Sequence, residues 1–229
     1  MFLSRTDNII FAVVKKKNNF FYLETITFLK NNKIQYSINE KFFKNKNNLK
    51  KISDIDFIIT VYWPHFIKSN FLEKSKSSLN FHPSFLPFNR GWYPHVHNII
   101  NGSKAGVSLH QLSNKFDNGN IWSQKKVIVK IEDNASTLHE RLGKEIFSLF
   151  KRKWSDIKNG KIKPTKQLRF LKFNSKKDID KFDEIDLYKK YKAIDLIKKI
   201  SARNFYDKSF SFFKFGGKKY KLHIKVSKS

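Results

Sequence analysis

Cysteine is absent from all 229 residues of the sequence. That absence excludes a disulfide framework, a cysteine-based zinc site and a cysteine nucleophile. Long apolar runs are absent too, because no stretch approaches the roughly 20 apolar residues that a membrane helix needs. The apolar run near the N-terminus is too short and too interrupted for a signal peptide. We therefore expect a cytoplasmic protein with no membrane partner.

Acidic residues are few: 19 Asp and Glu stand against 47 Lys and Arg, for a formal net charge of +28. Such a charge can indicate a nucleic-acid partner. The other enriched residues argue against it, because Asn, Ile, Phe and Tyr share A/T-rich codons with Lys, and phosphate binding would not select for 24 Phe. The lysines are also scattered along the chain, as in Lys15–Lys17, Lys44–Lys51 and Lys176–Lys181. We expect a solvated basic surface that attracts an anionic substrate, and no nucleic-acid partner.

Apolar runs and helical patterns alternate in the first part of the chain, which predicts an α/β fold with a parallel or mixed sheet. The expected strands are Ile9–Val14, Ile34–Ile38 and Asp56–Tyr62, with a helix over Phe20–Asn32 and a polar loop over Lys44–Lys51. Neither G-x-G-x-x-G nor G-x-x-x-x-G-K-[S/T] follows the first strand. A ligand would therefore be held in another way, at the carboxyl ends of the strands.

Strand and helix patterns continue to about residue 170, where the composition changes. We expect strands over Leu79–His82, Gly106–Leu112 and Ile121–Ile131, a loop over Ser84–Tyr93, and helices over Pro94–Ile100 and Ser136–Ile157. Ser136 or Thr137 would cap the long helix, with Glu140 completing a capping box. Beyond it, a helical pattern covers Asp178–Ile200, and Gly216-Gly217 predicts a hairpin over Phe210–Val226. We therefore predict a catalytic domain over residues 1–170 and a small helix-and-hairpin element over residues 171–229.

Three polar residues are placed to act together. Asn80 and His82 are two apart on a predicted strand, so their side chains point to the same side, and Pro83 ends the strand there. Asp117 lies in a turn that can return over the same end. An amide can donate to a developing oxyanion, an imidazole can move a proton, and a carboxylate can orient that imidazole. The set suits acyl transfer to an amine without a covalent intermediate. A structural explanation stays open at this point, because N-x-H alone is a weak pattern and an Asp-x-Gly sequence usually marks only a turn.

Ordered sequence blocks around these residues resemble the folate-dependent formyltransferases. The blocks are N-F-H-P-S-F-L-P from Asn80, R-G from Arg90, G-V-S-L-H from Gly106, D-N-G-N-I from Asp117 and T-L-H-E-R-L from Thr137. The resemblance implies a Rossmann-like domain without the glycine fingerprint, with Asn80, His82 and Asp117 as catalytic residues. It also implies 10-formyltetrahydrofolate as co-substrate and no metal. The family commonly has D-T-G where this chain has D-N-G, and the N-terminal half matches poorly.

The resemblance also implies binding residues. Those expected around the folate are Tyr62, His65, Phe66, Ile67, Leu86, Asn114, Lys115 and Phe116, although Phe66 and Ile67 suit an ordinary core equally well. Those expected around a nucleotide-linked sugar are Asn89, Arg90, Trp92 and Tyr93. Arg90 would meet the diphosphate, and Trp92 or Tyr93 would stack on the base, with plain packing as the alternative for Trp92. His95 and His97 lie at a helix start, where their spacing splays them apart, and His110 is expected to make a structural hydrogen bond.

Within the family, the segment N-R-G-W-Y-P-H-V from Asn89 resembles enzymes that act on dTDP-linked 4-amino sugars. By this resemblance we expect a sugar N-formyltransferase acting on a dTDP-linked amino-dideoxyhexose for surface polysaccharide, such as O-antigen. The first candidate acceptor is dTDP-4-amino-4,6-dideoxyglucose. The S-A-R-N-F segment from Ser201 and the hairpin resemble the small C-terminal element of the same enzymes, and we expect a homodimer. A methionyl-tRNA formyltransferase-like enzyme is one alternative, favoured by the charge. A non-catalytic basic RNA-binding protein is the other.

Overall fold

The computed structural model describes residues 8–13, 20–32, 34–38, 55–167 and 172–228. The predicted loop Lys44–Lys51 lies outside them. The chain divides into two compact units. The first unit comprises residues 1–82, 108–124 and 146–168, and the second comprises residues 83–107, 125–145 and 169–229. The predicted boundary near residue 170 stays a prediction.

A six-stranded sheet forms the framework of the fold. Its strands, in spatial order, are β2 (Gln35–Ile38), β1 (Asn8–Val13), β3 (Ile55–Val61), β4 (Ser75–His82), β6 (Gly106–His110) and β7 (Ile121–Lys126). β2, β1, β3 and β4 pair in parallel, whereas β4 and β6 are antiparallel, with Asn80 opposite His110. The prediction of an α/β fold with a mixed sheet is therefore confirmed.

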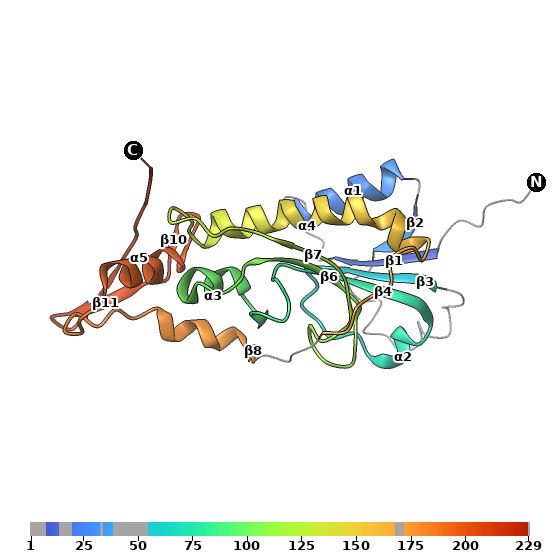
Figure 1. Cartoon of the computed structure of the whole chain (residues 1–229). Coiled ribbons are helices and arrows are strands. Elements are labelled where there is room, and N and C mark those ends of the chain that lie inside the picture. The colour runs from blue at the N-terminus through green and yellow to red at the C-terminus, as the bar shows by residue number, and fades with distance from the viewer. Residues whose placement is uncertain (1–7, 14–19, 33, 39–54, 168–171, 229) are drawn as a thin grey trace, which may run out of the picture. The chain divides into compact units, whose positions relative to one another are not determined.

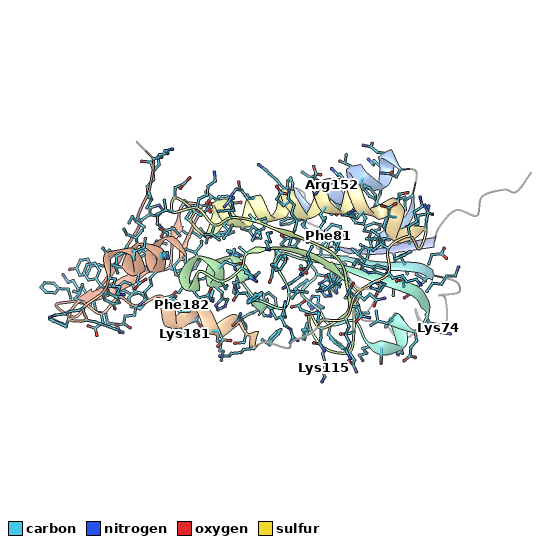
Figure 2. All side chains as sticks on the ribbon, viewed as in Figure 1. Lys74, Phe81, Lys115, Arg152, Lys181 and Phe182 are labelled. Carbon is cyan, nitrogen blue, oxygen red and sulfur yellow. The ribbon has the colours of Figure 1, made fainter. Side chains whose placement is uncertain are left out.

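Two helices cover one face of this sheet in the first unit, α1 (Phe20–Asn31) and the C-terminal part of α4 (Ala135–Lys158) (Figure 1). Phe81 of β4 lies between the sheet and α4, with its ring centroid 4.8 Å from that of Phe150 (Figure 2). The short helix α2 (Ser69–Leu72) covers the opposite face, where its Phe71 packs against Ile10 and Ile58. Alternate residues of the strands thus enter separate apolar layers.

The second unit contains short elements. They are β5 (Arg90–Gly91), α3 (Pro94–Asn101), β8 (Phe173–Asn174), the 3-10 helix η3 (Lys176–Phe182), α5 (Ala193–Ser201), β9 (Asn204–Phe205), β10 (Lys208–Ser209), β11 (Phe212–Phe215) and β12 (Lys218–Lys221). β5 pairs in parallel with β8, and α3 packs against α5. Pro94 begins α3 as predicted, and Gly102 ends it with a φ of 63°. β11 and β12 form the predicted hairpin around Gly216-Gly217, both with positive φ. Among the described helices, none combines the length and apolar composition that crossing a membrane requires.

The predicted continuous helix over Asp178–Ile200 is wrong. The structure has η3 and α5, separated by residues 183–192 without α-helix. The cause is a competing backbone pairing: Phe212 donates its N–H to the carbonyl of Asp183, and Ile185 donates its N–H to the carbonyl of Phe212. Backbone groups committed to the start of β11 cannot also extend a helix.

The predicted cap of the long helix is also wrong, because Ser136 and Thr137 both lie within its first turn. Asn134 caps α4: its Oδ1 accepts the Thr137 N–H at 3.0 Å. Thr137 Oγ1 accepts the Asn134 N–H in return, also at 3.0 Å. Asn is among the preferred capping residues, and this reciprocal pair takes the place of the expected box with Glu140.

Three strand boundaries differ from the prediction by more than one residue. β4 begins at Ser75 rather than Leu79, β6 ends at His110 rather than Leu112, and β7 ends at Lys126 rather than Ile131. The first residues of β4 are polar, so their strand geometry comes from pairing with β3 and not from an apolar run. Beyond Lys126 the apolar residues Ile128 and Ile131 are exposed, which shows that their alternation does not mark a buried strand face.

Candidate active site

The carboxyl end of β4 presents Asn80 and His82 on one side of the sheet, as their spacing predicts. Phe81, between them, points into the apolar layer beneath α4. His82 is buried, with 6% of its surface exposed, and Asn80 is half-buried. The strand ends at His82 and is followed by Pro83, in agreement with the expected break.

Asp117 comes back to this strand end from the loop after β6. Its Oδ1 lies 3.5 Å from Nδ1 of His82 and 3.7 Å from Nε2 of His110. The backbone of Asp117 is left-handed, with a φ of 51°, a conformation that non-glycine residues adopt only where surrounding contacts hold it. The amide, imidazole and carboxylate named from the sequence therefore lie together within the first unit.

A hydrogen-bond chain fixes how the Asn80 amide is turned. The hydroxyl of Thr60, on the neighbouring strand β3, donates to Oδ1 of Asn80 at 2.7 Å. Nδ2 of Asn80 lies 2.9 Å from Nε2 of His110, whose Nδ1 lies 2.7 Å from the carbonyl oxygen of Gln111. Because that carbonyl can only accept, Nδ1 of His110 carries the proton, and Nε2 of the neutral ring accepts from Asn80. One N–H of the amide is thereby engaged, and the other can serve a bound carbonyl.

This network includes the hydrogen bond expected of His110 and a residue that sequence reasoning missed. Thr60 is 1% exposed and lies directly opposite Asn80 in the β3–β4 register. A threonine in a buried apolar strand is a weak signal by itself. Its value as an indicator appears only once the register with β4 is known.

A cavity opens beside these groups. Five predicted folate residues line it (His65, Phe66, Ile67, Lys115 and Phe116), together with Thr60, Trp63, Asn80, His110, Leu112, Ser113 and Asp117. Phe66 and Phe116 contact each other edge to face, with centroids 5.4 Å apart, and 42% and 49% of their surfaces are exposed. Lys115, which is labelled in Figure 2, is exposed. The lining of the cavity thus combines hydrogen-bonding groups with exposed aromatic surface.

Three predicted folate residues, Tyr62, Leu86 and Asn114, do not line this cavity, and Ile67 has a second role beside it. The Tyr62 ring stacks on Phe21, with centroids 3.6 Å apart, and burial raises the pKa of its hydroxyl. Ile67 also belongs to an apolar core cluster, so its core role and its position at the cavity coexist. Asn114 is exposed and is not among the lining residues. Leu86, which is 1% exposed, belongs to the second unit.

The four predicted sugar-binding residues lie together in the second unit. Asn89 donates from Nδ2 to the hydroxyl of Ser103 at 2.6 Å, and 8% of Arg90 is exposed. The backbone N–H of Trp92 donates to the carbonyl of Asn174 at 2.8 Å. Lys176 Nζ lies 4.0 Å from the centroid of the Trp92 ring, a cation–π contact. Tyr93 has 36% of its surface exposed. Trp92 and Tyr93 therefore keep accessible ring surface, whereas Arg90 is buried.

Close backbone approach explains the glycine in this segment. Gly91 has a φ of 92°, and a Cβ there would meet the carbonyl oxygen of Asn174 at 2.3 Å. Only glycine both adopts this conformation and leaves room for the neighbouring strand β8. The N-R-G-W-Y segment is therefore held partly through its backbone, at Gly91 and Trp92.

Histidines of the second unit have a different environment. His95 and His97 are buried, and the His95 ring centroid is 5.0 Å from that of His139. Burial lowers the pKa of all three imidazoles, and for His95 the nearby His139, His97 and Arg203 lower it further. Within the described part of the chain, no three His, Asp or Glu side chains gather as a metal site would require.

The mixed sheet without a glycine fingerprint and the Asn–His–Asp group at a strand end define a class of α/β enzyme suited to acyl transfer. The family described as formyl transferase matches residues 3–151, more than half of the chain. The protein therefore belongs to the formyl transferase family.

Two curated relatives show which formyltransferases the chain is similar to. The dTDP-4-amino-4,6-dideoxyglucose formyltransferase of Mycobacterium bovis is 31% identical over 109 residues, or 48% of this chain and 47% of that protein. The methionyl-tRNA formyltransferase of Mycoplasma capricolum is 34% identical over 116 residues, or 50% of this chain and 37% of that protein. The chain thus spans half or less of the length of these curated relatives.

A solved structure covers more of the chain. It is a formyltransferase from Anoxybacillus kamchatkensis in complex with UDP-4,6-dideoxy-4-formamido-L-AltNAc and tetrahydrofolate. The likeness has a TM-score of 0.66 at 26% identity, and it covers 84% of this chain and 96% of that one.

Proposed function

We propose that the protein is a sugar N-formyltransferase, which moves the formyl group of 10-formyltetrahydrofolate onto the amine of a dTDP-linked amino-dideoxyhexose. The observation that carries this proposal is the grouping of Asn80, His82 and Asp117 at one strand end. Asn80 and Asp117 line one cavity, and His82, which is not among the lining residues, lies 3.5 Å from the Asp117 carboxylate. An amide donor, an imidazole and a carboxylate are the groups that acyl transfer to an amine needs.

The comparisons support the choice of co-substrate and acceptor. One relative is named for a dTDP-4-amino-4,6-dideoxyglucose acceptor, and the solved structure holds tetrahydrofolate with a 4-formamido sugar nucleotide. We take dTDP-4-amino-4,6-dideoxyglucose as the first candidate acceptor, in a pathway to surface polysaccharide. We further propose a cytoplasmic homodimer, and light scattering that returned a monomer would remove the dimer from the proposal.

The cavity suits the folate in chemical character. Trp63, Phe66 and Phe116 offer aromatic surface to a planar pterin ring, and the exposed surface of the two phenylalanines is the kind that a ligand covers. Thr60, Asn80 and Asp117 supply polar groups to the lining of the cavity. When bound, 10-formyltetrahydrofolate would supply an activated formyl group beside these polar groups.

Each of the three polar residues has a role in the transfer. Asn80 donates its second amide N–H to the formyl oxygen, on which negative charge develops as the sugar amine forms its new N–C bond. Before the transfer, the Asp117 carboxylate stabilises the protonated His82 beside it. Asp117 then accepts the proton that the amine loses, and His82 gives its own proton to the folate nitrogen as the old C–N bond breaks, so that both side chains end neutral. Thr60 and His110 hold Asn80 in the orientation that this donation requires.

Formylation of purified substrates tests the proposal directly. The protein is incubated with 10-formyltetrahydrofolate and a panel of dTDP- and UDP-linked 3-amino and 4-amino sugars, and the products are read by mass spectrometry. We expect one dTDP-linked sugar to gain a single formyl group, and a His82→Gln variant to lose this activity. A wild-type protein that folds, binds tetrahydrofolate and formylates none of the panel would contradict the acceptor class.

A second function has its own support, because the Mycoplasma capricolum relative is named methionyl-tRNA formyltransferase. The net charge of +28 is also compatible with a tRNA partner. Aminoacylated initiator tRNA therefore belongs in the same panel, and its formylation without any sugar product would decide for this alternative. Salt-sensitive RNA affinity without tetrahydrofolate affinity would instead indicate a non-catalytic RNA-binding protein.

A further inference from the structure

Gln167 reaches the Asp117 turn from a distant part of the sequence. Its Nε2 donates to the carbonyl oxygens of Asp117 at 3.1 Å and of Gly119 at 2.8 Å, residues 50 and 48 positions earlier in the chain. The side chain is 4% exposed. A single amide group thus holds both ends of the Asp117–Gly119 turn within the first unit.

The turn needs such support because its backbone is unfavourable and tightly packed. Asp117 has a φ of 51°, which a non-glycine residue adopts at a cost. A Cβ at Gly119 would meet the carbonyl oxygen of Gln111 at 1.8 Å, so the turn lies directly against the backbone after β6. The turn is therefore held on one side by Gln111 and on the other by Gln167.

The position of Gln167 is itself fixed. Two residues earlier, Thr165 exchanges both backbone hydrogen bonds with Ile121, at 2.8 Å each. This bridge aligns the segment after α4 with the first residue of β7. Gln167 is consequently placed by backbone pairing to a neighbouring strand.

We propose that Gln167 is a positioning residue for the transfer, which keeps the Asp117 carboxylate facing His82 and His110. The proposal rests on the proposed function and adds a residue that does not touch the substrate. Loss of the clamp would let the turn relax from its left-handed conformation, and the carboxylate would move from the imidazole at 3.5 Å. Misplacement of a catalytic group by about 1 Å can reduce a rate by a factor of about 100.

Kinetics of three variants test this role. Gln167→Leu removes the donor, and Gln167→Glu puts a carboxylate against the two carbonyls. Asn204→Leu is the matched control, because Asn204 is a buried amide of the second unit that donates from Nδ2 to the carbonyl of Ile224, 20 positions away, at 2.9 Å. We expect kcat to fall roughly 10- to 100-fold in Gln167→Leu and further in Gln167→Glu. The KM for the sugar nucleotide should stay within about twofold, and Asn204→Leu should keep wild-type kcat. An unchanged kcat in Gln167→Leu would overturn the proposal.

A double variant separates positioning from general damage to the fold. In an Asp117→Asn background, measured at high enzyme concentration, adding Gln167→Leu should reduce the residual rate by less than about twofold, because the group that it positions is already lost. The same fold-change as in the wild-type background would show that Gln167 does not act through Asp117.

Hydrogen exchange provides a readout that does not depend on activity or on the proposed function. Peptides covering residues 114–121 should exchange faster in Gln167→Leu than in the wild type, while those covering β1 and β3 should not. If these peptides exchange faster in Gln167→Leu but the wild-type protein transfers no formyl group, the proposed function is wrong and the role of Gln167 in holding the turn is supported. Unchanged exchange in the turn would sink the clamp, whatever the activity, and it can be measured on Gln167→Glu if Gln167→Leu fails to fold.

Discussion

Two groups of histidines lie in different units of the chain, and the groups around them differ in kind. In the first unit, His82 and His110 both lie within 4 Å of the Asp117 carboxylate, and His110 also contacts the Asn80 amide. The nitrogens of His110 bond to an amide and a backbone carbonyl. These rings are held by directional polar contacts.

In the second unit, His95 and His139 contact each other and the ring of Phe205, and His97 contacts Phe182. Burial lowers the pKa of each of these imidazoles. The lowered pKa favours the neutral form of these imidazoles, and the contacts named here are with other rings. The comparison teaches that a histidine becomes a candidate for proton transfer when a carboxylate and a cavity lie near it. Burial alone lowers the pKa of the imidazole and so disfavours its protonated form.

The largest expected effect is the loss of kcat in a His82 variant, and its absence would contradict the difference between the two groups. His82→Gln should reduce kcat by about 1,000-fold, since a positioned acid or base contributes typically 10²- to 10⁴-fold. His97→Gln, in the other group, should change kcat by less than about threefold while it lowers stability. Steady-state formylation of the acceptor sugar measures both. Comparable kcat losses in the two variants would mean that the groups do not differ in function.

A smaller effect sharpens the account of the first group. Thr60→Val removes the hydroxyl that donates to Asn80 Oδ1 and keeps the shape of the side chain. We expect kcat to fall about tenfold, from the loss of one orienting hydrogen bond of about 1 kcal/mol or slightly more. Thr25→Val is the control, because Thr25 is equally buried and donates to the Phe21 carbonyl within α1. Equal kcat losses in both variants would argue against an orienting role for Thr60.

The smallest effect concerns stability in the second group. The pKa of His95 is lowered in the folded chain, so the unfolded chain binds a proton near pH 6.5 and the folded chain binds it only at lower pH. Stability is therefore complete above this pH and falls as the pH drops below it, by at most about 1.4 kcal/mol per pH unit for each such histidine. His95→Gln should flatten this fall, measured by urea unfolding at pH 7.5 and 5.5.

The control for this measurement is His223→Gln, because His223 is exposed. We expect its pH dependence to match that of the wild type. If His95→Gln also keeps the full wild-type slope, then burial of His95 is not what makes the fold sensitive to acid.

The sequence predicted most reliably those parts of the fold in which apolar composition determines the structure. β1 and β3 are apolar runs with β-branched residues, and the structure places them within one residue of the prediction. β5 and β8 carry no such signal, because each is two residues long and exists only through pairing with the other. The start of β4 is polar and takes its conformation from β3. Elements of this kind depend on tertiary pairing that no local pattern encodes.

The candidate site divides in the same way. Strand periodicity and turn residues predicted that Asn80, His82 and Asp117 could lie close together, and the resemblance of the surrounding blocks to a known family singled them out. The structure brings them together, and their catalytic roles stay predictions. Thr60 and Gln167 could not be named, since each acts through a partner 20 or about 50 positions away. The positions of such supporting residues depend on the register between strands and on where a distant segment of the chain pairs with the sheet.

The antiparallel step between β4 and β6 has a consequence for how this protein could diversify. Residues 83–105 leave the sheet after His82 and re-enter it beside the same strand, with Ser108 opposite His82. The excursion is closed at its base by neighbouring strands, so its length and content can change while the register of the sheet stays the same. It carries Asn89–Tyr93, and β5 within it pairs with β8 of the C-terminal segment. A chimera that exchanges this excursion, with its predicted sugar-binding residues, for that of a relative would therefore have to graft both segments together, because neither would retain its hydrogen-bonding partner alone.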